Sequence, residues 1–155
     1  MADIYDAQTY EPRKGVGHLL NRVRTEMLAA VDKALAADAG LASLEVSSAQ
    51  FIILATLGMG KGSASDLCKG ISYDAGAMTR MIDRLEDKGL LRRNRSPDDR
   101  RLVNLELTEA GQAALPRMRE VSMGVLNRFL RGFTKAEARQ LESFLTRMLE
   151  NASGA

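Results

Sequence analysis

The stretch from Ser63 to Thr108 constrains the fold more than any other part of the chain. Capping residues and periodicity predict a helix over 63–69, a turn over 70–72 and a second helix over 74–88. Two strands follow, over 90–94 and 102–107, and an arginine-rich turn over 95–101 joins them. Gly89 ends the second helix, and Ser-Pro-Asp-Asp is a turn sequence. A helix-turn-helix followed by a basic hairpin is the layout of a winged DNA-reading module.

The second predicted helix has two different faces. Its inward stripe is apolar and consists of Met78, Met81, Ile82 and Leu85. The opposite side begins with small residues, which allow a close approach to DNA, and carries Arg80 and Arg84 one turn apart, within reach of bases or phosphates. The alternative is a solvated face with Arg–Asp pairs, because three acidic residues share the helix: Asp83, Glu86 and Asp87.

The predicted hairpin favours the DNA-binding interpretation. Five arginines and only two aspartates lie between residues 92 and 101. So many like charges repel one another unless they are solvated or contact an anion. The narrow minor groove has an enhanced negative potential and is a natural target for such a tip.

The rest of the chain reads as long helices. An apolar stripe runs along residues 15–37, and Ser47 caps a shorter apolar helix over 48–57. Thr108 caps a helix that extends to about residue 133, and Pro116 inside it should kink it or remove a hydrogen bond near the second turn. Thr134 caps the last helix, with residues 151–155 frayed, and residues 1–12 form an arm or a short helix.

Composition limits the function classes. With 155 residues and 45% hydrophobic content, one domain with its own core is expected. The net charge of +2 is too small to imply a nucleic-acid partner, so the charge distribution matters more. With one cysteine and one histidine, the sequence predicts neither an internal disulfide framework nor a metal cluster. A bound cofactor and enzymatic activity are also not expected. No signal peptide and no membrane-spanning run are evident, so a cytoplasmic protein without a membrane partner is expected.

The two ends of the chain carry wide apolar stripes that need a partner. The predicted organisation is a single domain, 1–155, in which a winged lobe over 47–108 lies between terminal helices over 15–40 and 109–152. The length of these terminal helices favours a bundle shared with a second copy, hence a homodimer. A two-fold dimer presents two recognition helices to one face of double-stranded DNA.

Two segments of the chain resemble the MarR family of winged helix-turn-helix transcriptional regulators. Residues 99–108, Asp-Arg-Arg-Leu-Val-Asn-Leu-Glu-Leu-Thr, are similar to the family's wing signature, Asp-x-Arg followed five residues later by Leu-Thr. Residues 78–90 are similar to its recognition helix and exit, and Glu-Ala-Gly at 109–111 continues the match. The resemblance implies a mainly α fold with a small β-hairpin wing, and a homodimer that binds pseudo-palindromic promoter DNA, usually as a repressor.

The resemblance also bears on the site residues. It implies that Arg101 enters the minor groove while Asp99 holds the wing through ionic contacts. Together with the helix pattern, it yields the predicted DNA-binding set Ser72, Gly76, Ala77, Thr79, Arg80, Arg84, Arg95, Asp99, Arg100 and Arg101.

The signal that such a regulator senses has several possible sites. Many family members respond to small aromatic acids or phenolics. His18 and Arg22 are one turn apart on the first helix, and we predict that they and Phe51 line a cleft for such a ligand. An exposed polar edge is the alternative for this pair. Cys68 is interpreted as a buried structural thiol, with a redox-responsive repressor as the alternative. A further alternative is a helical dimer whose basic hairpin meets another acidic partner, either protein or RNA.

Overall fold

The computed structural model describes residues 3–60, 62–63, 74–95 and 103–154. The fold is mainly helical, with one small sheet. Its elements, in chain order, are α1 (Val16–Ala37), the 3-10 helix η1 (Ala42–Leu44), α2 (Ser48–Leu57), β1 (Gly62–Ser63), α4 (Ala75–Asp87), β2 (Leu91–Arg95), β3 (Val103–Leu107), α5 (Glu109–Phe129) and α6 (Lys135–Ser153).

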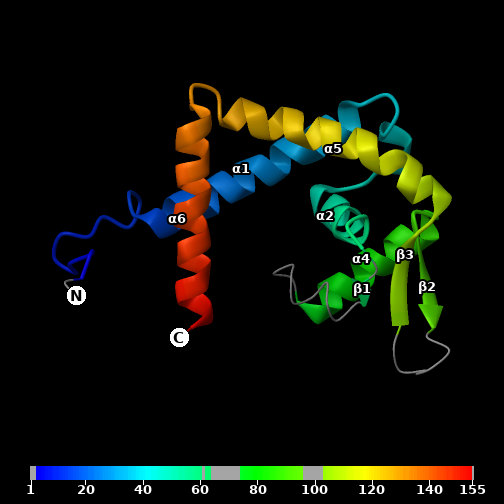
Figure 1. Cartoon of the computed structure of the whole chain (residues 1–155), viewed down its shortest axis with the longest axis horizontal. Coiled ribbons are helices and arrows are strands. Elements are labelled where there is room, and N and C mark those ends of the chain that lie inside the picture. The colour runs from blue at the N-terminus through cyan, green and yellow to red at the C-terminus, as the bar shows by residue number, and fades with distance from the viewer. Residues whose placement is uncertain (1–2, 61, 64–73, 96–102, 155) are drawn as a thin grey trace.

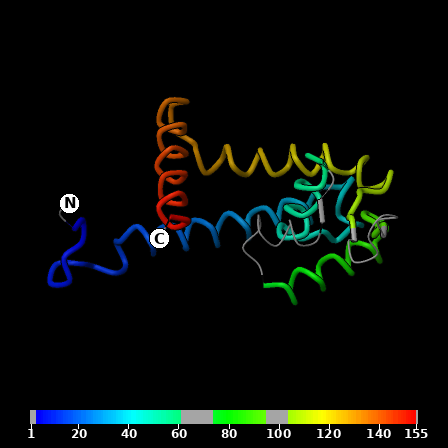
Figure 2. The backbone as a smooth tube through the Cα atoms, turned by 60° about the horizontal axis from the view of Figure 1, so that its bottom comes forward, coloured from blue at the N-terminus to red at the C-terminus, as the bar shows by residue number. Residues whose placement is uncertain are grey.

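Helices α1 and α5 form the long axis of the molecule. They lie side by side, and α2, α4 and the sheet gather as a lobe at one end (Figure 1). Helix α6 runs across their direction at the other end, close to the N-terminal segment, and the tube view shows the same arrangement (Figure 2). The two ends of the chain thus contribute long helices, and the middle of the chain forms the lobe.

The core lies where the lobe meets the C-terminal half of α1 and the first part of α5. Residues from every layer of this region are buried, and burying each such aliphatic side chain contributes roughly 1.5–3 kcal/mol. They are Val31, Leu35, Ile53, Leu54, Leu57, Met78, Ile82, Leu85, Leu90, Leu91, Leu105, Leu115, Met118 and Val125. The lobe is thus packed against α1 and α5 as one body.

The predicted helix starts are confirmed in atomic detail. Ser47 and Thr134 each form a capping box, the first with Gln50 and the second with Glu137. Thr108 accepts a hydrogen bond from the N–H of Gly111 and so caps α5. These short-range bonds satisfy backbone donors that have no partner inside the helix.

Some predicted boundaries and pairings are wrong. Gly62–Ser63 add a third strand, in the order β1-β3-β2, so the hairpin is part of a three-stranded antiparallel sheet. Helix α5 ends at Phe129, before the predicted residue 133, and α6 continues through Ser153 where fraying was predicted. The described part of the N-terminal segment contains no helix. The predicted helix over 64–69 and the turn over 70–72 lie outside the described residues.

The capping box at the start of α6 makes a pH-dependent contribution. Hydrogen bonds from the backbone N–H and the hydroxyl of Thr134 to the carboxylate of Glu137 lower the pKa of that group. A pKa lowered by folding gives stability that is fully present above the unfolded pKa and is lost as pH falls through the folded pKa. We therefore expect the first turn of α6 to loosen in acid.

A carboxyl-detected NMR titration measures this effect directly. Thr134→Ala removes the hydroxyl donor and leaves the backbone donor, so the pKa of Glu137 is expected to rise part of the way toward its ordinary value. An unchanged pKa in that variant would mean that the hydroxyl contributes nothing.

Candidate nucleic-acid interface

Helix α4 presents a polar face to solvent because its apolar stripe is fully used in the core. Met78, Ile82 and Leu85 are buried. Asp74 caps the helix by accepting a hydrogen bond from the N–H of Ala77 over 2.8 Å. The predicted DNA-binding residues of this helix lie on the other side: Gly76, Thr79, Arg80 and Arg84 are exposed and Ala77 is half-buried. The structure thus brings these five residues together on one surface.

The two exposed arginines of α4 are available for an external anion. Among the residues that the structure describes, neither Arg80 nor Arg84 forms a hydrogen bond or an ion pair through its side chain. The alternative interpretation paired them with the acidic residues of the same helix. That pairing does not form, because two of those carboxylates have another partner.

The other partner is Arg93 on β2. Its guanidinium contacts Asp83 over 2.6 Å and also bonds Glu86, and its backbone N–H donates to Glu86 over 3.0 Å. Burial alone would lower the pKa of Arg93, but the bonds to the two carboxylates outweigh it and raise the pKa. Arg93 therefore ties the wing to the recognition helix and is not free to bind DNA in this arrangement.

A second set of contacts joins the two strands of the wing. Arg92 lies opposite Glu106 in the antiparallel register, and their side chains are 3.2 Å apart. Asn94 donates to the same carboxylate over 2.6 Å. Sequence reasoning counted Arg92 and Arg93 in a uniformly basic hairpin and missed these roles, since cross-strand register was the only signal that pairs them with acids.

The remaining predicted contacts cannot be placed on this surface. Ser72, Asp99, Arg100 and Arg101, and also Cys68, lie outside the described residues. For Arg95 the structure describes the backbone, as the last residue of β2, and not the side chain.

The predicted effector residues do not come together. His18 and Arg22 are exposed on the N-terminal half of α1, whereas Phe51 is half-buried on α2. Phe51 lines a mostly apolar cavity of about 160 Å³, whose other walls are Met27, Leu28, Val31, Ser48, Ile52, Ser122 and Leu126. On a helix with 3.6 residues per turn, Met27 and Val31 lie about 140° and 180° around the axis from Arg22. Arg22 therefore points away from this cavity.

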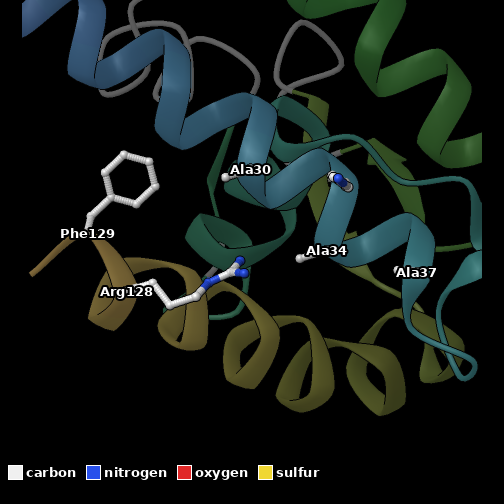
Figure 3. Close-up of a pocket in the computed structure, with 6 residues that line it drawn as sticks. Ala30, Ala34, Ala37, Arg128 and Phe129 are labelled. Atoms are coloured by element: carbon white, nitrogen blue, oxygen red, sulfur yellow. The ribbon is translucent and has the colours of Figure 1, made fainter. Parts of the chain in front are cut away.

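A second hollow lies between α1 and α5, and sequence reasoning did not anticipate it. It has a volume of about 560 Å³ and is lined by Ala30, Lys33, Ala34, Ala37, Arg128 and Phe129. In Figure 3 the Arg128 side chain extends from α5 toward α1, beside the small alanine side chains. Within the described part of the chain, the side chains of Lys33 and Arg128 form no hydrogen bond or ion pair.

Neither a cluster of metal ligands nor a membrane-spanning helix is present among the described residues. No group of three or more histidine, cysteine, aspartate or glutamate side chains is placed to hold a metal ion there. Of the helices in the described ranges, none combines the length and the apolar character that crossing a bilayer requires.

Known proteins share this architecture and parts of this sequence. Residues 46–103 match the profile of the MarR family. The chain is 33% identical over 130 residues to the HTH-type transcriptional repressor NicR of Pseudomonas putida, covering 79% of this chain and 78% of that protein. It is 32% identical over 111 residues to the multiple antibiotic resistance protein MarR of Escherichia coli, covering 70% of this chain and 77% of that protein.

A third relative matches over a shorter length. The uncharacterized HTH-type transcriptional regulator YdgJ of Bacillus subtilis is 33% identical over 89 residues, which cover 57% of this chain and 54% of that protein.

Solved structures extend the similarity to most of the chain. The structure of Bordetella bronchiseptica BpsR, described as regulated in its DNA binding by 6-hydroxynicotinic acid, has a TM-score of 0.77 and 27% identity, covering 90% of this chain and 96% of that one. A mutant Escherichia coli MarR in complex with operator DNA has a TM-score of 0.74 and 28% identity, covering 86% of this chain and 93% of that one.

Proposed function

Because this chain belongs to the MarR family of transcriptional regulators, we propose that it is a homodimeric repressor that binds a pseudo-palindromic operator and leaves it when an aromatic acid binds. The observation that carries DNA binding is the free face of α4. Its apolar side is in the core, its carboxylates Asp83 and Glu86 are held by Arg93, and Arg80 and Arg84 are left exposed and unpaired among the described residues.

The experiment for this proposal is selection and footprinting of DNA. Genomic fragments retained by the purified protein are sequenced, and the enriched site is footprinted. We expect an inverted repeat with half-sites about 10 bp apart, centre to centre, because a two-fold dimer places its recognition helices in successive major grooves. No enriched sequence would contradict operator binding, and a direct repeat would contradict the two-fold arrangement.

The homodimer is supported by apolar surface that this chain leaves uncovered. One side of α6 is apolar, yet no residue of this helix is buried. On that side Leu141, Phe144 and Met148 are 39%, 46% and 39% exposed. The N-terminal half of α1 and the end of α5 are similar, with Val16, Leu19, Val23, Leu126, Phe129 and Phe133 exposed. Contiguous apolar surface of this kind marks an interaction site, and all three segments gather at the end away from the lobe (Figure 1).

Charges placed on the apolar side of α6 test the dimer. The double variant Leu141→Glu with Phe144→Glu is expected to shift the protein from dimer to monomer in light scattering at low micromolar concentration. Each change removes roughly 1.5–3 kcal/mol of apolar burial at an interface and adds a charge there. The helical content by circular dichroism should be retained, because neither residue belongs to the buried core.

The matched control adds the same charge to the opposite side of the same helix. Ser143→Glu with Thr146→Glu lies away from the apolar stripe and should leave the dimer intact. If the Leu141/Phe144 variant remains as fully dimeric as the wild type, or if both variants disrupt the dimer equally, this face is not the dimer interface.

The proposed effector is an aromatic acid, bound in the hollow between α1 and α5 with Lys33 and Arg128 as the cations that meet its carboxylate. BpsR, which responds to 6-hydroxynicotinic acid, supports the ligand class. A ligand releases DNA only if it binds better to lobe positions that do not fit the operator, and a coupling of about 1–3 kcal/mol is typical. His18 and Arg22, which lie on the side of α1 away from the cavity at Phe51, serve as the comparison pair.

Calorimetry with two double variants decides between these pairs. Binding of 6-hydroxynicotinate, salicylate and benzoate is measured for the wild type, for His18→Ala with Arg22→Ala, and for Lys33→Ala with Arg128→Ala. We expect the second variant to lose affinity by about tenfold, which corresponds to 1.4 kcal/mol. Loss confined to the first variant would move the site away from the hollow in Figure 3, and no binding by the wild type would refute the ligand class.

A further inference from the structure

Lys88 connects the end of the recognition helix to a distant part of the chain. It is the C-cap residue of α4, and its Nζ donates hydrogen bonds to the carbonyl oxygens of Leu44 over 2.6 Å and Glu45 over 2.7 Å. These two residues are the last residue of η1 and its C-cap. One half-buried ammonium group therefore bridges segments that are more than 40 positions apart in the sequence.

The two carbonyls need an outside donor. The last carbonyls of a helix have no partner within the helix, and η1 consists of only three residues. Glu45 adopts a left-handed conformation, with φ 47° and ψ 40°, which non-glycine residues seldom adopt. Such a conformation persists where surrounding contacts hold it, and the bond from Lys88 is one of those contacts.

The connector that Lys88 reaches is itself fixed to the long helices. The segment runs from Asp38, at the end of α1, to Ser47, at the start of α2. At one end, the carboxylate of Asp38 accepts hydrogen bonds from Gly40 and from Arg117 of α5. At the other end, the N–H of Ser48 donates to Asp32 of α1 over 2.5 Å. Lys88 thereby joins α4 to a frame held by α1, α2 and α5.

We infer that Lys88 is a positioning residue for operator binding: it sets the orientation of α4 relative to the long helices. The inference rests on the proposed function. Gly76, near the start of α4, is 12 residues from Lys88, which is about 18 Å along the helix axis. If α4 tilts by about 10° about its Lys88 end, its DNA-facing end moves by roughly 3 Å. That shift exceeds the tolerance of a hydrogen bond to a base edge. Lys88 thus acts through Gly76, Thr79 and Arg80 without contacting DNA.

The test compares Lys88→Met, which keeps the apolar stem and removes the donors, with Lys88→Arg, whose guanidinium can donate to the same carbonyls. Lys135→Met is the control, since it removes the same charge from an exposed position of α6, away from the lobe. Dissociation constants for the operator and for an unrelated duplex are measured over a salt series. For Lys88→Met we expect operator binding about tenfold weaker, binding to unrelated DNA nearly unchanged, and the salt slope unchanged. Lys88→Arg should restore most of the affinity.

The salt slope separates positioning from a phosphate contact. If Lys88 contacted DNA directly, its loss would reduce the slope by about 0.9 and would weaken both duplexes equally. That result, or an unchanged operator affinity, would overturn the inference. A loss of equal size in Lys135→Met would attribute the effect to net charge and would overturn it as well.

Hydrogen–deuterium exchange of the DNA-free protein keeps the inference testable if the wild type selects no operator. In Lys88→Met, amide exchange is expected to accelerate in the last turn of α4 and in residues 42–47, while α6 stays unchanged. Unchanged exchange in both segments would show that the bridge does not hold them, whatever the outcome with DNA.

Discussion

Replacing Arg80 and Arg84 together with alanine is expected to weaken operator binding by about 2–4 kcal/mol, a factor of roughly 30 to 1,000 at fixed salt. Both side chains are exposed on α4 and have no partner among the described residues, so they are free to meet base edges or phosphates. For the same reason their loss should change the free energy of unfolding by less than about 0.5 kcal/mol.

Fluorescence anisotropy with the footprinted operator measures this effect, and a second pair of arginines provides the control. Arg119→Ala with Arg131→Ala removes the same charge from exposed positions in and just after α5, away from the face of α4. We expect this control to weaken binding far less. If the two double variants behave alike, the protein binds DNA through its overall charge and α4 is not the reading helix.

Gly111→Ala is expected to destabilise the protein by about 2 kcal/mol. A Cβ atom at Gly111 would lie 2.0 Å from the carbonyl oxygen of Leu90, far inside contact distance, and that oxygen also accepts the N–H of Thr108. Forcing the first turn of α5 away from the lobe costs about 3 kcal/mol. The better helix propensity of alanine offsets about 1 kcal/mol of this cost. The nearest atoms belong to the backbone of Leu90, which cannot move aside as the end of a flexible side chain could.

Gly124→Ala is the matched control, because it is the same substitution in the same helix. No atom lies within 4 Å of a Cβ built at Gly124, so only the propensity gain of about 0.5–1 kcal/mol remains. Urea unfolding at one fixed protein concentration measures both variants, since the stability of the proposed dimer would depend on concentration. Equal stability of the two variants would mean that α5 is not packed closely against Leu90.

Local sequence pattern determined much of the fold. Ser47, Thr108 and Thr134 mark helix starts correctly, because an N-cap bonds to a backbone group only a few residues away. The buried stripe of α4 follows from the helical period in the same way, and the polar side that remains is the predicted DNA-binding face. Both features depend on residues close together in the chain, so one sequence is enough to recognise them.

Tertiary contacts decided what the arginines and the apolar stripes do. Arg92 and Arg93 were indistinguishable from the other arginines of the hairpin, and only the strand register and the packing of β2 on α4 give them carboxylate partners. Strand β1 exists because β3 lies beside it, about 40 residues later in the chain. His18 and Arg22 lie one turn apart in the sequence, yet the packing of α1 on α2 puts the cavity at Phe51 on the other side of the helix. In each case the partner is distant in sequence, and the periodicity of one segment carries no information about which distant segment it will meet.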